Sequence, residues 1–179
     1  MNNILMKLYE QQKKVSIFDN IKDTSKFKFG QIRCITEEEI AINLISPNGE
    51  YDGVLAEKVD RVYKVETDNQ YEEKMNKLCS LSKLELGATC NVDSNVFDYL
   101  LLLALETKKI VAIELVDSGY DDVVGFVEEI NMNCLKVKNI DYYGTEDGYS
   151  FISLNDITQI SYDSQDEQRL LKLWMANQS

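Results

Sequence analysis

The stretch PNGEYDGV, Pro47 to Val54, decides the fold, because its Gly-x-x-Asp-Gly pattern returns 95 residues later in YYGTEDGY, Tyr142 to Tyr149. Phosphate-binding loops, calcium loops and tight turns can all carry such a pattern. A phosphate loop needs a helix after it, whereas strand-like runs lie on both sides of each copy. Calcium loops need oxygen ligands at alternating positions, which neither copy offers. Both stretches are therefore predicted to be turns between two strands, where glycine supplies positive φ and aspartate bonds to its own backbone.

The match between the two halves extends far beyond these glycines. When the chain is shifted on itself by 95 residues without a gap, identical residues meet on both sides of the pattern. The identical pairs include Gly30 with Gly125, Ile45 with Ile140, Asp68 with Asp163, and Glu72 with Glu167. The sequence therefore predicts one module written twice, with residues 1–83 as the first copy, residues 84–94 as a linker and residues 95–179 as the second copy.

Each copy contains five short runs rich in β-branched residues, separated by turn residues, as expected for strands. In the first copy these runs are VSIFDNI (15–21), GQIRCI (30–35), EIAINLIS (39–46), GVLAEKV (53–59) and DRVYKVE (60–66). An amphipathic helix should follow the fifth strand, with capping boxes at Asn69 and Glu72 and at Ser164 and Glu167. Another helix should precede each first strand, over residues 2–12 and 95–107. The predicted fold class is mainly β with flanking helices.

The helix expected over residues 95–107 is apolar almost all round, and Leu100 to Leu103 cover all of its faces. A helix that is apolar on every side must be buried. We therefore expect at least three of these four leucines to be buried. The helix should lie between the two copies or in a dimer interface.

A helix followed by five short, strongly bent antiparallel strands resembles the Sm-like small barrel, a variant of the SH3-like fold, here in tandem. The resemblance covers both copies and rests on Gly30-x-Ile32-x-x-Ile35 with Ile40 and Ile42, and on Gly125-x-Val127-x-x-Ile130 with Leu135 and Val137. In the first Sm motif, a glycine in the second strand permits sharp bending. The resemblance implies two tandem five-stranded barrels from an internal duplication.

The family's RNA-reading residues have no clear equivalents in this chain. Thr36 and Asn131 stand where the family places a base-contacting Asp, and the Arg-Gly pair of the second Sm motif is missing. The resemblance therefore implies the fold and not the nucleic-acid contacts.

Composition excludes several kinds of chemistry. The 179 residues include no histidine, which removes Ser-His-Asp and Cys-His arrangements and most zinc sites. Four cysteines, Cys34, Cys79, Cys90 and Cys134, form no Cys-x-x-Cys pair and are expected to be buried small hydrophobes. Glu37 to Glu39 and Asp121 with Asp122 could be metal-binding or acid–base carboxylates. The three glutamates are interpreted as a solvated hairpin tip, because Met132 to Cys134 stand at the same place in the second copy. We expect no catalytic residue, no metal site and no cofactor.

Two groups of residues are candidates for binding. Lys22, Lys26, Lys28 and Arg33 cluster in the sequence around the first two strands of the first copy and would contact an anion or nucleic acid. Several aromatics crowd the second copy, namely Tyr142, Tyr143, Tyr149, Phe151 and Tyr162. Barrel core and strand pairing should take at least half of them. We select Tyr142, Tyr143 and Tyr149 as the candidate surface for contact with another protein.

Charge and hydropathy favour a protein partner. The net charge of −12 opposes binding to nucleic acid and to membrane surfaces. No secretory leader or membrane-spanning run is visible, which predicts a cytoplasmic protein. We expect a non-enzymatic binding or adaptor protein whose partner is another protein. The alternative is an Sm-like RNA-binding regulatory protein, and the sequence leaves a homo-oligomer open.

Overall fold

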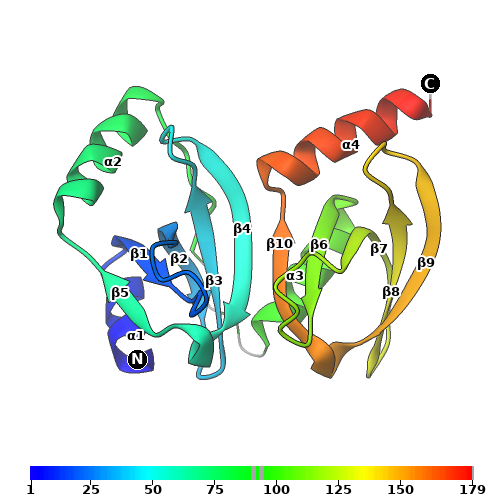
Figure 1. The fold of residues 1–179 in the computed structure, drawn as a ribbon, viewed down its shortest axis with the longest axis horizontal. Coiled ribbons are helices and arrows are strands. Elements are labelled where there is room, and N and C mark those ends of the chain that lie inside the picture. Colours follow the sequence, from blue (N-terminus) through cyan, green and yellow to red (C-terminus); the bar gives the residue numbers. More distant parts are fainter. Residues whose placement is uncertain (90–91, 93–94, 179) are drawn as a thin grey trace. The chain divides into compact units, whose positions relative to one another are not determined.

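The computed structural model describes residues 1–89, 92 and 95–178, and the chain divides into two compact units, Met1–Val96 and Phe97–Ser179. Figure 1 shows that each unit is built of a bent antiparallel sheet with helices packed against it. Each unit is described by itself. Among the described residues, no helix is both long enough and apolar enough to cross a membrane.

The first unit contains two helices and five strands. They are α1 (Asn2–Glu10), β1 (Lys14–Phe18), β2 (Lys28–Ile35), β3 (Glu39–Ile45), β4 (Tyr51–Lys58), β5 (Lys64–Glu66) and α2 (Gln70–Leu81), with a 3-10 turn at Val59–Arg61. The strands follow the order β5-β1-β2-β3-β4, and each pairs antiparallel with its neighbours. In Figure 1, α1 and α2 lie at opposite ends of this unit.

The second unit repeats this plan after α3 (Val96–Thr107). Its elements are β6 (Ile110–Leu115), β7 (Val123–Ile130), β8 (Cys134–Ile140), β9 (Glu146–Ser153), a 3-10 turn at Leu154–Asp156, β10 (Ile157–Tyr162) and α4 (Gln165–Asn177). Its strand order, β10-β6-β7-β8-β9, corresponds to that of the first unit. Strands β7, β8 and β9 begin and end 95 residues after β2, β3 and β4. The pairing of β2 with β3 contains a register shift, and the pairing of β7 with β8 contains a shift at the corresponding place.

The fold class of mainly β with flanking helices is confirmed, and so are the five strands of each copy. Both predicted helix starts are also confirmed. The Asn69 side chain accepts a hydrogen bond from the Glu72 amide, and Ser164 and Glu167 form a reciprocal capping box. The Glu72 side chain accepts from the Asp68 amide rather than from that of Asn69, so the predicted box is complete only at Ser164. The strand order ends at β5 and β4 in the first unit and at β10 and β9 in the second. Among the described residues, the two end strands of a unit do not pair with each other. Closure of each sheet into a hydrogen-bonded barrel is therefore not observed.

The first glycine of each repeated pattern lies in the turn between the third and fourth strands of its unit. Gly49 has φ +80° and Gly144 has φ +75°, so both use the left-handed conformation that favours glycine. Each turn also packs closely on the following helix. A Cβ atom at Gly49 would lie 2.7 Å from the Leu78 side chain, and one at Gly144 would lie 2.8 Å from the Leu173 side chain. The prediction of paired turns therefore holds for this glycine.

The second half of the pattern differs from the expectation. Gly53 and Gly148 lie inside β4 and β9, next to register shifts in those ladders, rather than in the turn. In the second unit the side chain that bonds the turn is Asp141, which accepts hydrogen bonds from the Tyr143 and Thr145 amides. The turn therefore begins at Asp141, three residues before the Gly-x-x-Asp-Gly pattern, because an aspartate side chain can bond backbone amides two to four positions ahead of it.

Two apolar clusters form the core of the first unit. One joins Leu5 and Leu8 of α1 to Ile17, Ile32 and other residues of the sheet. The other joins Phe29, Ile45, Met75 and Cys79, between the sheet and α2. In the second unit, Ile110, Phe126 and Ile140 pack with Leu170, Leu171 and Trp174 of α4. Each terminal helix thus buries its apolar face against the sheet of its own unit.

Helix α3 is less buried than expected. Leu100 and Leu101 have no exposed surface, but Leu102 is 50% exposed and Leu103 is half-buried. The expectation that at least three of the four leucines are buried is therefore wrong. An all-apolar sequence can still have one side exposed to solvent, because exposed leucine is common on protein surfaces. The placement of α3 between the copies or in a dimer interface stays a prediction.

The cysteines follow the expectation in part. Cys34 and Cys79 are buried thiols. Cys134, at the first position of β8, is a half-buried thiol. Cys90 lies outside the described residues.

Candidate protein-binding face

Strands β8 and β9 place two lysines and two aromatics on one face of the second unit. Lys138 pairs with Tyr149 in the ladder, and Lys136 pairs with Phe151. Directly opposed residues in an antiparallel pair, and residues two apart on one strand, point to the same side of the sheet. Lys136, Lys138, Tyr149 and Phe151 are called the β8–β9 face below.

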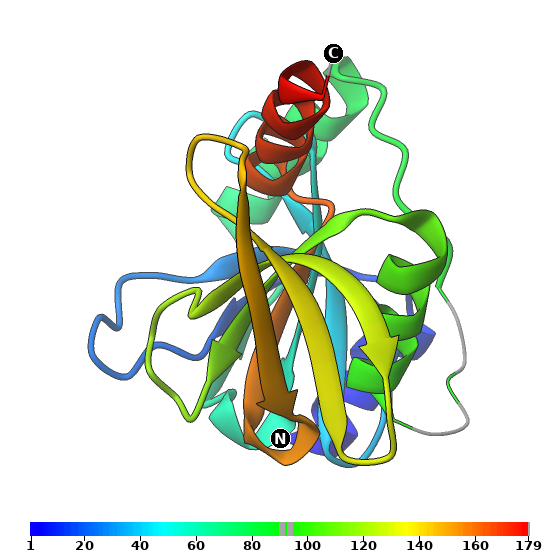
Figure 2. The same cartoon turned by 90° about the vertical axis from the view of Figure 1, so that its right-hand side faces the viewer.

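The two aromatics of this face are open to solvent. Tyr149 is 53% exposed and Phe151 is 71% exposed. The Lys136 ammonium lies 4.3 Å from the centre of the Tyr149 ring, a cation–π contact. Figure 2 shows β8 and β9 at the front of the second unit, below α4. The outer part of the face therefore offers apolar area together with a positive charge.

Lys138 marks the border between the open part of this face and the part that α4 covers. Its Nζ atom lies 3.2 Å from Glu146 Oε1 and 3.8 Å from Glu128 Oε1. The same ammonium lies 5.6 Å from the ring centres of both Phe126 and Trp174. Lys138 is therefore held by carboxylates and rings, whereas the half-buried Lys136 lies against the exposed Tyr149 ring.

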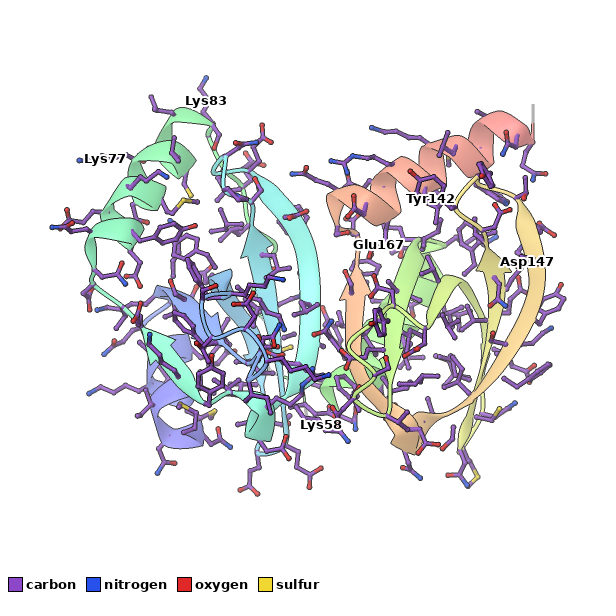
Figure 3. All side chains as sticks on the ribbon, in the orientation of Figure 1. Lys58, Lys77, Lys83, Tyr142, Asp147 and Glu167 are labelled. Carbon is purple, nitrogen blue, oxygen red and sulfur yellow. The ribbon has the colours of Figure 1, made fainter. Side chains whose placement is uncertain are left out.

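The tyrosines of the β8–β9 turn lie next to α4, as Figure 3 shows for Tyr142. Tyr142 and Tyr143 are 87% and 75% exposed, and their rings meet edge to face at 5.7 Å. Asn177 of α4 donates hydrogen bonds to the Tyr143 and Gly144 carbonyl oxygens, both at 3.0 Å. The turn backbone is thus fixed while both rings remain available for contact. All three predicted tyrosines are exposed.

Phe151 and Lys136 complete the face but are not among the site residues that the sequence predicts. Phe151 follows Tyr149 by two positions, which is the spacing of one face of a strand. That signal was present in the sequence. Lys136 could be placed only from the strand register, which depends on the bulge between Lys138 and Ile140. Tyr162, the remaining aromatic of the group, is 5% exposed.

The four basic residues of the first copy have different environments. Lys22 and Lys26 lie in the loop between β1 and β2, and Lys26 is 3.6 Å from Asp23. Lys28 opens β2, and its ammonium lies 2.6 Å from Asp19 Oδ2 and 2.7 Å from Glu57 Oε2. The half-buried Arg33 donates to the Asn43 side chain at 3.4 Å. Lys28 is thus already neutralised by two carboxylates. Anion or nucleic-acid contact by this group stays a prediction.

The carboxylates around Lys28 are unusual for their burial. Glu57 has no exposed surface, and its burial raises its pKa to about 7. The positive charge of Lys28 lowers this pKa, and the negative charge of Asp19 raises it, but burial is the largest effect. The pKa of Asp19 is lowered: burial alone would raise it, but the charge and hydrogen bond of Lys28 outweigh that effect. This triad was not predicted from the sequence, because its members come from three separate elements.

The sequence also singles out a second carboxylate pair, Asp121 and Asp122, at the end of the loop between β6 and β7. Asp122 accepts hydrogen bonds from the Leu115 amide and the Ser118 hydroxyl, and these bonds lower its pKa. Burial raises the pKa of Asp121, and the nearby Glu114 carboxylate reinforces this. Within residues 1–89, 92 and 95–178, no group of three His, Cys, Asp or Glu side chains is arranged to hold a metal ion.

A pocket of about 680 Å³ opens beside the three glutamates of the first unit. It is lined by Asn2, Asn3, Met6, residues 35–39, Val92 and Asn95. Glu37 and Glu38 are exposed, but Glu39 is buried and accepts hydrogen bonds from the Val96 amide and the Asn95 side chain. The interpretation of all three as solvated is wrong for Glu39, which is buried and bonded to Asn95 and Val96 of its own unit.

No protein family and no curated protein matches the chain. Two solved structures are weakly similar over 98% of the chain. One is MrkH of K. pneumonia in its apo state, at 9% identity, with 91% of that chain covered and a TM-score of 0.21. The other is YcgR of Escherichia coli in complex with c-di-GMP, at 6% identity, with 88% of that chain covered and a TM-score of 0.20. Likenesses at this level carry no argument about function.

Proposed function

We propose that the protein is a non-enzymatic binding or adaptor protein, built of two tandem five-stranded small barrels of the Sm-like type, and that its partner is another protein. The observation that carries the proposal is the group of exposed tyrosines on the second unit, Tyr142, Tyr143 and Tyr149. Exposed tyrosine supplies a large, rigid contact area with a polar end, and it is enriched where proteins bind one another.

The strand order supports the small-barrel part of the proposal. Both units have their fifth strand beside the first and their fourth strand at the other end. The two motif glycines allow the second and third strands to approach closely. A Cβ atom at Gly30 would lie 2.2 Å from the Asn43 carbonyl oxygen, and one at Gly125 would lie 2.0 Å from that of Lys138. Bent, tightly paired strands are what a small barrel requires.

The charged side chains of the described residues give little support to an enzyme or to an RNA-binding protein. In the triad of Asp19, Lys28 and Glu57, the lysine forms an ion pair with each carboxylate. The pairing of Lys28 also leaves fewer cations for a phosphate backbone than the sequence indicates. A binding role needs neither cofactor nor metal.

The test is affinity capture with the tagged full chain from its native cell, compared with a variant carrying Tyr142→Ser, Tyr143→Ser and Tyr149→Ser. We expect a protein captured by the parent to be lost with the variant. Tyr120→Ser is the matched control, because Tyr120 is 77% exposed on the same unit but lies in the loop between β6 and β7. Equal capture by parent and triple variant, or recovery of nucleic acid instead of protein, would contradict the proposal.

A further inference from the structure

The loop that joins the first two strands has opposite charge in the two units. In the first unit this loop is residues 19–27, and its lysines, Lys22 and Lys26, are both exposed. Lys26 lies 3.6 Å from Asp23, but 73% of its side chain remains exposed. In the second unit the loop is residues 116–122, which include no lysine or arginine and three exposed aspartates, Asp117, Asp121 and Asp122.

Aromatic rings lie beside the loop of the first unit. The centre of the Phe18 ring lies 5.2 Å from that of Phe27 and 6.5 Å from that of Tyr63, and Phe27 meets Tyr71 edge to face at 5.0 Å. Phe18 is buried, but Phe27 is 37% exposed and Tyr63 is 39% exposed. The Lys64 ammonium lies 4.0 Å from the centre of the Phe18 ring, a cation–π contact. Apolar area and positive charge therefore occur together here.

The loop itself adds apolar area to these rings. Ile21 is 78% exposed. The Tyr63 hydroxyl lies 3.4 Å from the carbonyl oxygen of Asn20, so this ring borders the loop. The exposed side chains of Ile21, Lys22, Lys26, Phe27 and Tyr63 are called the β1–β2 surface below.

In the second unit, a carboxylate takes the place of the Phe18 ring. Phe18 pairs with Lys64 in the ladder of β1 with β5, and Glu114 pairs with Gln159 in the ladder of β6 with β10. Gln159 lies 95 residues after Lys64. Glu114 is buried and accepts a hydrogen bond of 3.1 Å from the Gly119 amide. The same corner of the module therefore carries rings and cations in one unit and carboxylates in the other.

The carboxylates of the second unit repel one another. Burial raises the pKa of Asp121, and the negative charges of Glu114, Asp166 and Asp122 raise it further. A cation that approached this loop would relieve the repulsion. The loop therefore favours a positively charged partner.

The β6–β7 loop also exposes two apolar side chains. Val116 is 69% exposed and Tyr120 is 77% exposed. Val116 has φ +47°, which a β-branched residue rarely adopts, and backbone strain of this kind is concentrated at functional sites. The loop thus presents apolar groups between carboxylates, whereas the β1–β2 surface presents apolar groups between lysines.

We propose that the β1–β2 surface of one chain binds the β6–β7 loop of a second copy, so that copies associate head to tail. Val116 and Tyr120 cover Phe27 and Tyr63, and the aspartates pair with Lys22 and Lys26. Charge complementarity of this kind selects the partner and fixes its orientation. A second copy is the occupant because each chain carries both halves of the contact. Since the two halves differ, each complex has one free surface of each kind and can extend.

This inference goes beyond the proposed function, because it uses neither Tyr142 nor the β8–β9 face. The net charge of −12 opposes association at long range. At about 0.15 M salt the Debye length is about 8 Å, so this repulsion is largely screened while pairs in direct contact still attract. The test is therefore made at that salt concentration.

The test is sedimentation velocity of the full chain over a range of concentrations. We expect the average mass of the parent to rise with concentration. Lys22→Glu with Lys26→Glu, or Asp117→Lys with Asp121→Lys, should weaken this association at least about tenfold, because like charges then meet. Lys77→Glu and Glu106→Lys are the controls and should leave it unchanged, because both residues are exposed elsewhere on their units.

Mixing the two double variants makes the test specific. Each variant keeps one half of the contact, so an equimolar mixture should form a complex of one copy of each and nothing larger. A chain that carries all four substitutions should associate again, because its charges are exchanged rather than removed. Loss of folding would not produce this recovery. Circular dichroism melts check each variant, and Asp121→Lys alone replaces the second double variant if that variant does not fold.

Several outcomes would overturn the inference. They are a parent that stays monomeric up to about a millimolar chain, association that the charge reversals leave unchanged, and a mixture of the double variants that forms no complex. The last result with an associating parent would mean that the two surfaces do not meet between copies.

One variant separates this inference from the proposed function. Tyr142→Ser with Tyr143→Ser and Tyr149→Ser should lose the captured protein and associate like the parent. If it captures nothing but still associates, the inference stands whatever protein the tyrosines bind. If it no longer associates, self-association belongs to the tyrosine surface and the inference falls.

Discussion

Gly49 and Gly144 are required for two separate reasons, and both reasons can be measured. Each residue has a positive φ, and each approaches a helix at a distance that leaves no room for a side chain. Gly119 shares only the first property, because it has φ +81° and a Cβ atom added there would meet nothing within 4 Å. Substitutions at Gly144 and Gly119 therefore separate backbone strain from steric contact.

We predict that Gly144→Ala lowers the free energy of unfolding by roughly 2–4 kcal/mol, from backbone strain and displacement of α4. Gly119→Ala should cost only about 1 kcal/mol, from strain alone. Urea denaturation followed by circular dichroism measures both values. Equal costs for the two substitutions would contradict the close packing of the turn on α4.

Glu57 should make stability depend on pH. Its pKa is about 7 in the folded chain and near the ordinary value of 4.5 when unfolded, so the folded state holds a proton that the unfolded state has released. Stability should therefore fall as pH rises from 4.5 to 7. The lowered pKa of Asp19 has the opposite effect, because it makes stability fall as pH decreases. That effect occurs below pH 3.8, the ordinary pKa of aspartate, and so lies outside the range from pH 4.5 to 7.

Glu57→Gln should remove this loss, because the amide cannot ionise. We expect the variant to gain stability relative to the parent by on the order of 2 kcal/mol between pH 5 and pH 8. Urea denaturation at the two pH values measures the difference, with Glu38→Gln, at an exposed position of the same unit, as the control. If variant and parent differ in free energy of unfolding by the same amount at both pH values, the buried position of Glu57 is refuted.

At the scale of elements, α3 combines buried and exposed leucines in consecutive positions. Leu101→Asp should lower the free energy of unfolding by several kcal/mol, about 3 or more, because it buries an unpaired charge. Leu102→Asp should cost less than about 1 kcal/mol, because Leu102 is half exposed. Thermal melts of the two variants provide the comparison. Similar melting temperatures would mean that the helix is oriented differently or is peripheral.

The elements could be predicted from sequence where the signal is local. Strand alternation, the caps at Asn69 and Ser164 and the turns at Gly49 and Gly144 each depend on residues a few positions apart. The orientation of α3 could not be predicted, because four consecutive leucines give no periodicity. The position of Gly53 in a strand was missed for a related reason, since a bulge changes the register without an obvious change in composition.

The candidate site was only partly predictable. Exposed tyrosines could be proposed from their number near the β8–β9 turn, but Lys136 required the strand register. The triad of Asp19, Lys28 and Glu57 joins β2, β4 and the residue after β1. Such contacts between distant residues leave no periodic signal in a single sequence. For the same reason, Lys28 was assigned to an anion-binding group although its charge is neutralised internally.

At the scale of the whole molecule, net charge determines what the protein avoids. With a charge of −12, it should not bind generic single-stranded RNA or DNA at physiological salt. Weak binding at low salt should be lost when Lys22 and Lys26, both exposed, are changed to glutamate. Lys172→Glu in the second unit is the control and should have no effect. Fluorescence anisotropy at two salt concentrations measures this, and tight, salt-resistant binding to a specific oligonucleotide would favour the RNA-binding alternative.

Val54 and Ala56 have no exposed surface, whereas Tyr149 and Phe151, which stand 95 residues later, are exposed; Ala41, 95 residues before Lys136, is also fully buried. A change to a charged residue at Ala41, Val54 or Ala56 would place that charge in the interior of the first unit. The same change 95 residues later would affect only a surface, and the fold would tolerate it. At these positions the first unit is therefore restricted to small or apolar residues, whereas the second unit accepts lysine and aromatic residues without loss of the fold.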